Sequence, residues 1–288
     1  MGDGSPSAFR ERFISAQDGL KLYFRDYGDP WSAATPVLCL PGVTRNSKDF
    51  GPLAARLSRH RRVICPDYRG RGRSDYDHDW RNYQPATYVN DIRHLLVACG
   101  VHRAHVIGTS LGGILAMAMA VAMPGVAVSA VLNDIGPEVG IAGLGGIVAY
   151  MRQDRAFPDL QSAADHIRAV FPDLPARSPE DWLTIAGNTY LEQPGRGFVR
   201  DWDHAIVNTF GRALDRNMAF WPLFGALRRM PVLAVRGAKS PILSQDTFDK
   251  MAVYMPGLMR VVVGDCGHPV ALNERNVLEA LDAHLARA

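Results

Sequence analysis

The sequence predicts an α/β fold with a doubly wound, mostly parallel sheet and one helical insertion. Strand-like and helix-like segments alternate early in the chain and again near its end, a rhythm typical of a parallel sheet with helices on both faces. Residues 106–133 contain no charged side chain, as expected for strands covered on both sides. The middle of the chain breaks the alternation. We therefore assign residues 1–136 and 229–288 to an α/β core and residues 137–228 to a helical cap.

Local patterns place the elements of the first segment in order. Asp18-Gly19 predicts a hairpin turn between the first two strands. Apolar residues spaced three and four apart from Val89 to Cys99 predict an amphipathic helix, which Gly100 ends. Strands are expected at 9–16, 20–27, 36–40, 63–65, 105–108 and 126–132, and helices at 49–58, 87–99 and 111–123.

The insertion has no strong strand pattern but is rich in aromatic side chains, including Trp182, Trp202 and Trp221. This aromatic content is too high for a disordered linker, so a packed helical unit is predicted. The alternation then resumes with a strand at 231–235, a helix at 245–254, a strand at 259–263 and a final helix at 270–285.

The charge pattern argues against a nucleic-acid partner. The chain has 32 basic and 29 acidic residues, a net charge of +3, which creates no strong field. Basic residues cluster at 59–62 and 69–73, but Asp67, Asp75 and Asp77 surround the second cluster. That cluster is therefore expected to be a solvated loop.

The sequence also indicates a cytoplasmic protein with no membrane partner. Cys39 and Cys65 lie in apolar runs, which is typical of buried thiols in a reducing compartment. The N-terminal M-G-D-G-S-P-S lacks an apolar segment of the kind found in secretory signals. Residues 106–133 are long enough to span a bilayer, but internal glycines and Pro124 favour a buried strand, helix and strand instead.

The pattern Gly108-Thr109-Ser110-Leu111-Gly112 indicates a nucleophile. It lies directly after a predicted strand and directly before a predicted helix, where a sharp turn needs a glycine on either side and aims the serine out of the sheet. An unreactive glycine-rich turn is the alternative. The predicted flanking elements favour Ser110 as a nucleophile.

His268 is the best candidate for a general base. It lies in the loop between a predicted strand and the last helix, at the edge of the sheet that also carries Ser110. A loop histidine with only a backbone hydrogen bond is the alternative. The other histidines are assigned elsewhere: His60, His94, His102 and His284 to the solvated surface, and His166 and His204 to the insertion, where they could line a pocket.

These motifs resemble the α/β-hydrolase superfamily over nearly the whole chain. The matching stretches are L-P-G-V, D-Y-R-G-R-G-R-S, G-T-S-L-G-G, N-D-I-G-P and G-D-C-G-H-P. The resemblance implies Ser110 as the nucleophile, His268 as the base, and the backbone N–H groups of Val43 and Leu111 as an oxyanion hole. The insertion matches the helical cap of this family, and no metal or organic cofactor is implied.

The chain departs from many relatives at two positions. Pro41 stands where they have histidine, which leaves the backbone donor at Val43 in place. In V-R-G-A-K-S-P, Pro241 stands where they have the catalytic aspartate, and proline cannot orient an imidazole.

We predict that Asp134 supplies the missing acid, because it ends the sixth strand on the same rim and some relatives carry their acid there. Its alternative role is only to cap the entry of the chain into the insertion. Asp246 and Asp249 fall in the next predicted helix, and Asp265 lies on the loop of His268, so all three are weaker candidates.

The D-Y-R-G-R-G-R-S loop is interpreted as scaffold, with Asp67 expected to pair with a neighbouring arginine. Arg71 or Arg45 could instead bind a substrate carboxylate, although charged loops are usually only solvated.

The predicted function is hydrolysis of a small, largely apolar carboxylic ester or lactone through an acyl-enzyme. A carbon–carbon bond hydrolase acting on ring-cleavage products would use the same three side chains. A catalytically weakened, ligand-binding member of the family is the alternative from another class.

Overall fold

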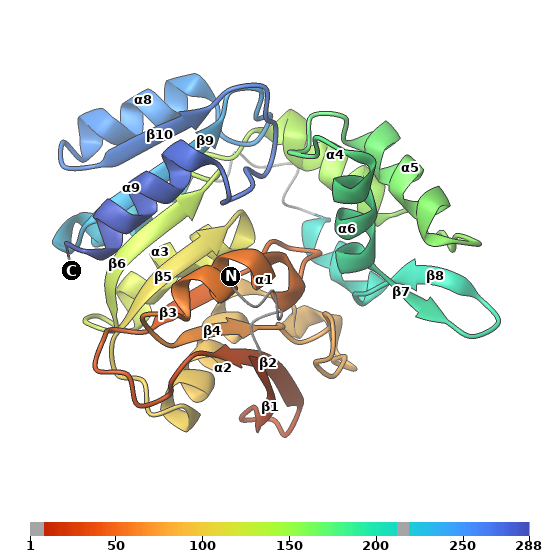
Figure 1. Ribbon diagram of the computed structural model, residues 1–288, viewed down its shortest axis with the longest axis horizontal. Coiled ribbons are helices and arrows are strands. Elements are labelled where there is room, and N and C mark those ends of the chain that lie inside the picture. Colours follow the sequence, from red (N-terminus) through yellow and green to blue (C-terminus); the bar gives the residue numbers. More distant parts are fainter. Residues whose placement is uncertain (1–8, 212–218, 288) are drawn as a thin grey trace, which may run out of the picture.

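The computed structural model describes residues 9–211 and 219–287, and its centre is an eight-stranded sheet in the order β1-β2-β4-β3-β5-β6-β9-β10 (Figure 1). The strands are β1 Phe9–Ser15, β2 Lys21–Tyr27, β3 Val37–Leu40, β4 Val63–Pro66, β5 Ala104–Thr109, β6 Ala127–Asn133, β9 Val232–Gly237 and β10 Met259–Val263. Only the pairings β1–β2 and β2–β4 are antiparallel, and the other pairings are parallel. The predicted mostly parallel α/β sheet is therefore confirmed.

Helices cover both faces of this sheet. The helices α1 Gly51–Leu57 and α9 Arg275–Leu285 pack on one face. The helices α2 Pro85–Ala98, α3 Leu111–Ala122 and α8 Gln245–Tyr254 pack on the other. No helix in the described part of the chain is long and apolar enough to cross a membrane.

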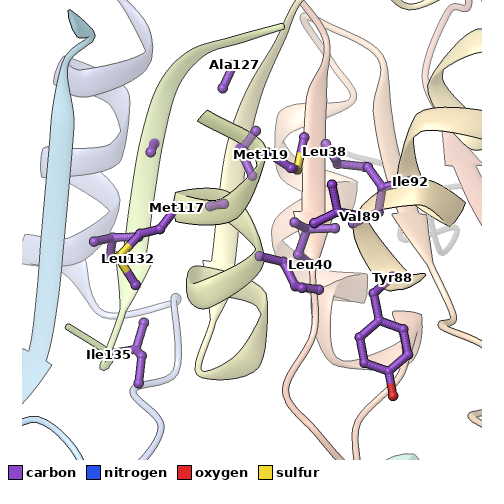
Figure 2. Close-up of a cluster of buried hydrophobic side chains, with 14 of the residues drawn as sticks. Leu38, Leu40, Tyr88, Val89, Ile92, Met117, Met119, Ala127, Leu132 and Ile135 are labelled. Carbon is purple, nitrogen blue, oxygen red and sulfur yellow. The ribbon is translucent and has the colours of Figure 1, made fainter. Parts of the chain in front are cut away.

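Side-chain alternation along the strands creates two apolar layers. Leu38 and Leu40 of β3 belong to the larger cluster, on the face of α2 and α3 (Figure 2), whereas Val37 and Cys39 belong to the smaller cluster under α1 and α9. Successive strand residues point to opposite faces, so fully apolar strands are buried on both sides. This explains why residues 106–133 contain no charged side chain.

The insertion leaves the sheet after β6 and forms a separate group of elements beyond the strand ends, at the right of Figure 1. It contains α4 Ile141–Met151, α5 Leu160–Val170, α6 Pro179–Thr189 and the hairpin β7 Tyr190–Gln193 and β8 Gly197–Arg200. Its own apolar cluster includes Phe157, Ile167 and Trp182. A short helix, α7 Trp221–Ala226, leads back to the core, and its Phe224 joins the larger cluster of the sheet.

Three local predictions were wrong. The hairpin β7–β8 lies in a segment where no strand was expected. The last helix begins at Arg275 rather than at residue 270. Val270 lies in the rim loop, where its carbonyl accepts a hydrogen bond from the Asn133 side chain (2.9 Å). His284 was expected at the surface but is fully buried in the last turn of α9.

Candidate active site

Ser110 occupies a sharp turn between β5 and α3. Its φ is 53° and its ψ is −115°, a backbone region that residues other than glycine rarely adopt. A side-chain carbon at Gly108 would lie 2.3 Å from the Gly112 carbonyl, and one at Gly112 would lie 2.0 Å from the Leu40 carbonyl oxygen. Both positions therefore require glycine, and together they hold the serine at the carboxyl end of the sheet.

The structure brings the side chains of Ser110, His268 and Asp134 into one hydrogen-bonded chain. His268 Nε2 lies 2.9 Å from Ser110 Oγ, and His268 Nδ1 lies 2.8 Å from Asp134 Oδ2. The imidazole thus contacts a hydroxyl on one side and a carboxylate on the other. This arrangement allows the carboxylate to fix the tautomer in which Nε2 accepts the serine proton.

Asp134 is held in place by the backbone around it. It directly follows β6, has a φ of 55° and is 0% exposed. Its N–H donates to the Val235 carbonyl (2.8 Å), and its Oδ1 accepts from the Gly237 N–H (2.9 Å). One carboxylate oxygen is therefore anchored to β9, and the other is left to His268.

The weaker acid candidates all lie away from the imidazole. The Asp265 side chain is 99% exposed and lies 3.5 Å from Lys239 Nζ. Asp246 pairs with Lys250 (2.7 Å) and Asp249 with Arg260 (2.7 Å), both on the surface. Asp134 is the carboxylate within hydrogen-bond distance of His268 in the described part of the chain.

Pro241 is itself exposed, but its neighbours Ser240, Ile242 and Leu243 are buried, and the loop docks on the start of the cap. A side-chain carbon at Gly140 or Gly143 would lie 2.2 Å or 2.5 Å from the Pro241 carbonyl oxygen, and the Gly140 N–H donates to the Ile242 carbonyl (2.8 Å). The loop that carries the acid in many relatives is therefore used here as a contact between core and cap.

The loop that follows β3 approaches Ser110 from the other side. A side-chain carbon at Gly42 would lie 3.8 Å from Ser110 Cβ. Among the described residues, neither the Val43 N–H nor the Leu111 N–H donates a hydrogen bond to a backbone carbonyl. Leu111 begins α3, and the first N–H groups of a helix have no acceptor within the helix. Both amides therefore remain available as hydrogen-bond donors.

Two buried side chains donate hydrogen bonds to carbonyl groups of the loop after β3. The Tyr68 hydroxyl donates to the Pro41 carbonyl (3.1 Å), and Arg71 Nε donates to the Val43 carbonyl (2.9 Å). The Arg71 guanidinium also lies over the ring of Tyr88, 4.9 Å from its centroid. Both residues belong to the D-Y-R-G-R-G-R-S motif, so the motif could have identified them, but nothing in it indicates that they contact residues 41–43.

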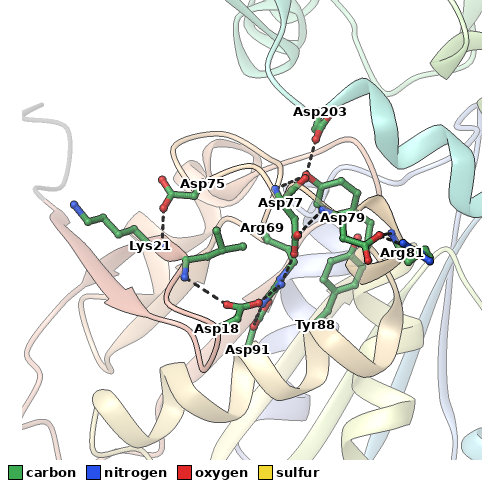
Figure 3. A network of polar contacts seen from close by, with 12 residues as sticks. Asp18, Lys21, Arg69, Asp75, Asp77, Asp79, Arg81, Tyr88, Asp91 and Asp203 are labelled. Carbon is green, nitrogen blue, oxygen red and sulfur yellow. Dashed lines mark hydrogen bonds and ion pairs between the residues drawn. The ribbon is translucent and has the colours of Figure 1, made fainter.

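The same motif connects the β1–β2 turn, the following loop and α2 through charged contacts. Arg69 is buried and lies within hydrogen-bond distance of Asp18, Asp77 and Asp91, each at 2.6–2.8 Å (Figure 3). Asp67, by contrast, accepts hydrogen bonds from the backbone N–H groups of Ser47 (2.7 Å) and Arg73 (2.9 Å). The prediction that Asp67 pairs with an arginine side chain is wrong, because backbone N–H groups donate to both of its carboxylate oxygens.

Arg45 extends from the loop after β3 into the cap. Its guanidinium forms a two-pronged contact with Asp49 (2.6 and 2.7 Å) and donates to Thr189 Oγ1 at the end of α6. Its charge is thus balanced by Asp49 within the protein. This contact was not predictable from sequence, because Thr189 lies in no motif.

A cavity opens in the cap next to this contact, and we call it the cap cavity. Its walls are formed by Tyr150, Gln153, Arg155, His166, Tyr190, Arg200 and Trp202. The hydroxyls of Tyr150 and Tyr190 are 2.8 Å apart. His166 lines this cavity, whereas His204 lies beside it, with its ring centroid 6.5 Å from that of Trp202.

The Cys266 thiol is close to the imidazole loop but is poorly suited to act as a nucleophile. Burial, followed by the negative charge of Asp134, raises the pKa of Cys266 to about 11. The thiol is therefore protonated near neutral pH. In the described part of the chain, no group of three or more histidine, cysteine or acidic side chains is arranged to hold a metal ion.

Comparisons with known proteins identify the family. A sequence profile described as the alpha/beta hydrolase family matches residues 37–280. The chain is 28% identical to a 3-hydroxybutyrate-oligomer hydrolase of Cupriavidus necator, covering 86% of this chain and 87% of the relative. It is 27% identical to a 2-(acetamidomethylene)succinate hydrolase of Mesorhizobium japonicum, covering 81% of each.

Solved structures give the same result. An alpha/beta hydrolase from Novosphingobium aromaticivorans superimposes with a TM-score of 0.90 at 39% identity, over 97% of this chain and 99% of that one. An E-2-(acetamidomethylene)succinate hydrolase superimposes with a TM-score of 0.83 at 25% identity, over 97% of this chain and 100% of that one. The sheet order, the serine turn and these similarities lead to one conclusion: this chain belongs to the alpha/beta hydrolase family.

Proposed function

We propose that this protein is a serine hydrolase that cleaves a small, largely apolar carboxylic ester or lactone. The observation that carries the proposal is the hydrogen-bonded chain from Ser110 Oγ through His268 to the buried Asp134. A serine hydroxyl becomes a good nucleophile only when a base removes its proton as it attacks. The imidazole is positioned for that transfer, and the carboxylate stabilises the imidazolium that results.

The reaction follows from this arrangement. Ser110 Oγ attacks the substrate carbonyl carbon while its proton passes to His268 Nε2. The tetrahedral intermediate collapses as His268 returns that proton to the leaving alkoxide, and an acyl-serine remains. Water then attacks the acyl carbon with His268 as base, and the acid product leaves with Ser110 restored.

Charge develops on the carbonyl oxygen in both steps. We assign its stabilisation to the N–H groups of Val43 and Leu111, which belong to the loop after β3 and to the first residue of α3. Loss of one such donor typically costs about 3 kcal/mol of transition-state stabilisation. The positive end of α3 adds to the same field.

An ester is favoured over the carbon–carbon bond of a ring-cleavage product. The C. necator relative acts on 3-hydroxybutyrate oligomers, and hydroxy acids are joined to one another through ester bonds. The weakened, ligand-binding alternative depended on a missing acid. The contact between Asp134 and His268 supports the hydrolase over this alternative, because it offers an acid in place of the one absent at Pro241.

The proposal is tested by hydrolysis of 4-nitrophenyl acetate with the native chain and with Ser110→Ala, Asp134→Asn and Pro241→Asp. We expect Asp134→Asn to lose about ten-thousandfold in kcat and Ser110→Ala about a millionfold. Asp265→Asn is the matched control, because it removes an exposed acid from the same loop as His268.

Three outcomes would contradict parts of the proposal. Near-native activity of Asp134→Asn would exclude Asp134 as the acid. An inactive native chain that gains activity with Pro241→Asp would instead favour the weakened, ligand-binding alternative. Turnover of a ring-cleavage product faster than of any ester would favour the carbon–carbon hydrolase.

A further inference from the structure

The cap helix α6 ends on side chains of the α/β core. A helix leaves the carbonyl groups of its last turn without partners inside the helix, and Gly187 and Asn188 lie in that turn. Lys48 Nζ donates to the Gly187 carbonyl (3.0 Å), and Asn46 Nδ2 donates to the Asn188 carbonyl (3.2 Å). The positive charge of Lys48 also suits the negative end of the helix dipole. Two side chains of the core therefore complete the end of α6.

A buried carboxylate of the cap contacts the same two side chains. Asp201 directly follows β8 and is 6% exposed. Its Oδ2 accepts hydrogen bonds from Lys48 Nζ (2.8 Å) and from Asn46 Nδ2 (3.0 Å). Asn46 is 1% exposed, and the two hydrogens of its amide nitrogen go to Asp201 and to the Asn188 carbonyl. The orientation of the Asn46 amide is thus set by the cap.

The backbone of Asp201 is itself fixed to two further elements. Its N–H donates to the Thr189 carbonyl at the end of α6 (3.0 Å), and its carbonyl accepts from the Gly72 N–H (2.9 Å). Gly72 follows Arg71, whose Nε donates to the Val43 carbonyl (2.9 Å). Asp201 is therefore a firmly held point of the cap, and it lies beside a residue that supports Val43.

Asn46 directly follows the turn that carries Val43. The Arg45 N–H donates to the Gly42 carbonyl (3.2 Å) and closes a turn over residues 42–45, which we call the oxyanion turn. The side chain of Asn46 also accepts a hydrogen bond from the backbone two residues further on (3.1 Å). The exit of the oxyanion turn is therefore fixed at Asn46.

The oxyanion turn is thereby held at both ends. The core holds its start, because the Tyr68 hydroxyl donates to the Pro41 carbonyl. The cap holds its exit, because the Asp201 carboxylate accepts from Asn46. The Val43 N–H lies between these two points. A hydrogen bond weakens steeply as its angle departs from linear, so a shift at either end would weaken the contact of this N–H with an oxyanion.

We propose that Asp201 is a positioning residue for the reaction at Ser110. Its carboxylate fixes the exit of the oxyanion turn through Asn46 and Lys48, and this contact keeps the Val43 N–H directed at the developing oxyanion. The cap thus contributes to the chemical step and not only to substrate binding. This inference rests on the proposed function, because the Val43 N–H has this role only when Ser110 attacks a carbonyl.

The test uses Asp201→Asn, Asn46→Ser, the double variant and the control Asp154→Asn. Asparagine keeps the size of Asp201 and removes its charge. Serine can still cap the short helix η1 Ser47–Phe50, but it lacks the amide that contacts Asp201. Asp154 is a cap carboxylate that pairs with Arg200 (2.7 Å) and is 63% exposed. Its replacement changes the net charge as Asp201→Asn does and removes no contact of the oxyanion turn.

Two measurements report on the oxyanion contact: hydrolysis of 4-nitrophenyl acetate and inhibition by butylboronic acid. The boronic acid forms a tetrahedral adduct with an active-site serine, so its binding needs the same donors as the transition state. We expect Asp201→Asn and Asn46→Ser each to lose about tenfold in kcat, with KM within about twofold of the native value. The inhibition constant should rise about tenfold in both, and Asp154→Asn should match the native chain.

The double variant tests whether the two side chains act through one contact. Its kcat should equal that of the slower single variant, because the second substitution removes a contact that is already lost. Losses that multiply in the double variant would overturn the proposal. So would a native kcat and a native inhibition constant in both Asp201→Asn and Asn46→Ser, even with a lower thermal midpoint, because the role would then be structural.

The remaining outcomes separate this inference from the proposed function. If Asp201→Asn does not fold, Asn46→Ser decides the question by the same criteria. Hydrolysis that is abolished in Ser110→Ala but unchanged in Asp201→Asn and Asn46→Ser would refute this inference alone. A native chain that hydrolyses no ester would refute the proposed function and this inference with it.

Discussion

Tyr68 contributes to the site through a single hydroxyl. Its O–H donates to the Pro41 carbonyl, one residue before Gly42 and two before the amide that we assign to the oxyanion hole. Tyr68→Phe keeps the ring and removes that hydrogen bond, so the amide at Val43 should be held less precisely. We expect kcat for 4-nitrophenyl acetate to fall about threefold to tenfold, because oxyanion donors act mainly on the transition state.

Kinetics and stability together distinguish this role from a purely structural one. KM and the thermal midpoint of Tyr68→Phe should stay close to the native values. Tyr76→Phe is the control, since Tyr76 is an exposed tyrosine of the neighbouring loop. A parallel loss of kcat and thermal stability in Tyr68→Phe would contradict a positioning role.

At the residue scale, the sequence predicts best where the backbone itself demands a residue type. Gly108 and Gly112 are required by close backbone contacts, so the serine turn is readable directly. The role of Asp134 as the acid could be inferred only because Pro241 has no carboxylate to orient the imidazole. The anchoring of Asp134 by the Gly237 N–H was not predictable, because any residue except proline offers that donor.

The helix α6 carries Thr189 at its end, so its stability supports the contact between cap and core. Its start is a capping box: the Asp181 N–H donates to Ser178 Oγ (3.2 Å), and the Ser178 N–H donates to Asp181 Oδ2 (3.0 Å). Ser178→Ala removes one partner and should lower the free energy of unfolding by about 1 kcal/mol.

Urea denaturation followed by circular dichroism measures this change. Thr184→Ala lies on the exposed side of the same helix and should cost less, because alanine favours helix more than threonine does. If both variants lost the same stability, the capping box would not be the cause.

At the element scale, long and strongly patterned segments were predictable and short exposed ones were not. The strands β3, β5 and β6 could be predicted from the sequence, because both of their faces are buried and their residues are therefore mostly apolar. The hairpin β7–β8 has two strands of four residues, and most of their side chains are at least partly exposed, so little hydrophobic alternation marks it. In the loop before α9, Val270 is held by Asn133, 137 residues away in the chain, and no local pattern contains that information.

The whole molecule contains two buried histidines that should make its stability depend on pH. Desolvation is the main cause that lowers the pKa of His105 and of His284 to about 4. In the unfolded chain both titrate near 6.5. Below that value the unfolded state binds more protons than the folded state, so stability falls with decreasing pH until about pH 4.

Each histidine should therefore cost about 2 kcal/mol between about pH 7.5 and about pH 5. His284→Leu should reduce this loss, because it removes a fully buried imidazole whose two nitrogens have no partner among the described residues. Urea denaturation of both proteins at the two pH values measures the difference. His60→Leu is the control, because His60 is exposed. An unchanged pH dependence in His284→Leu would contradict this account.

The contact of Pro241 with Gly140 and Gly143 has a consequence for the exchange of caps between members of the family. The proposed acid, Asp134, stands only six residues before Gly140, and the loop after β9 fits against these two glycines with no space for a side chain. A chimaera joined at residue 137 would replace both glycines and push that loop outward, together with the strand end that anchors Asp134. A graft that begins after Gly143 would change specificity while leaving the catalytic geometry of the host intact.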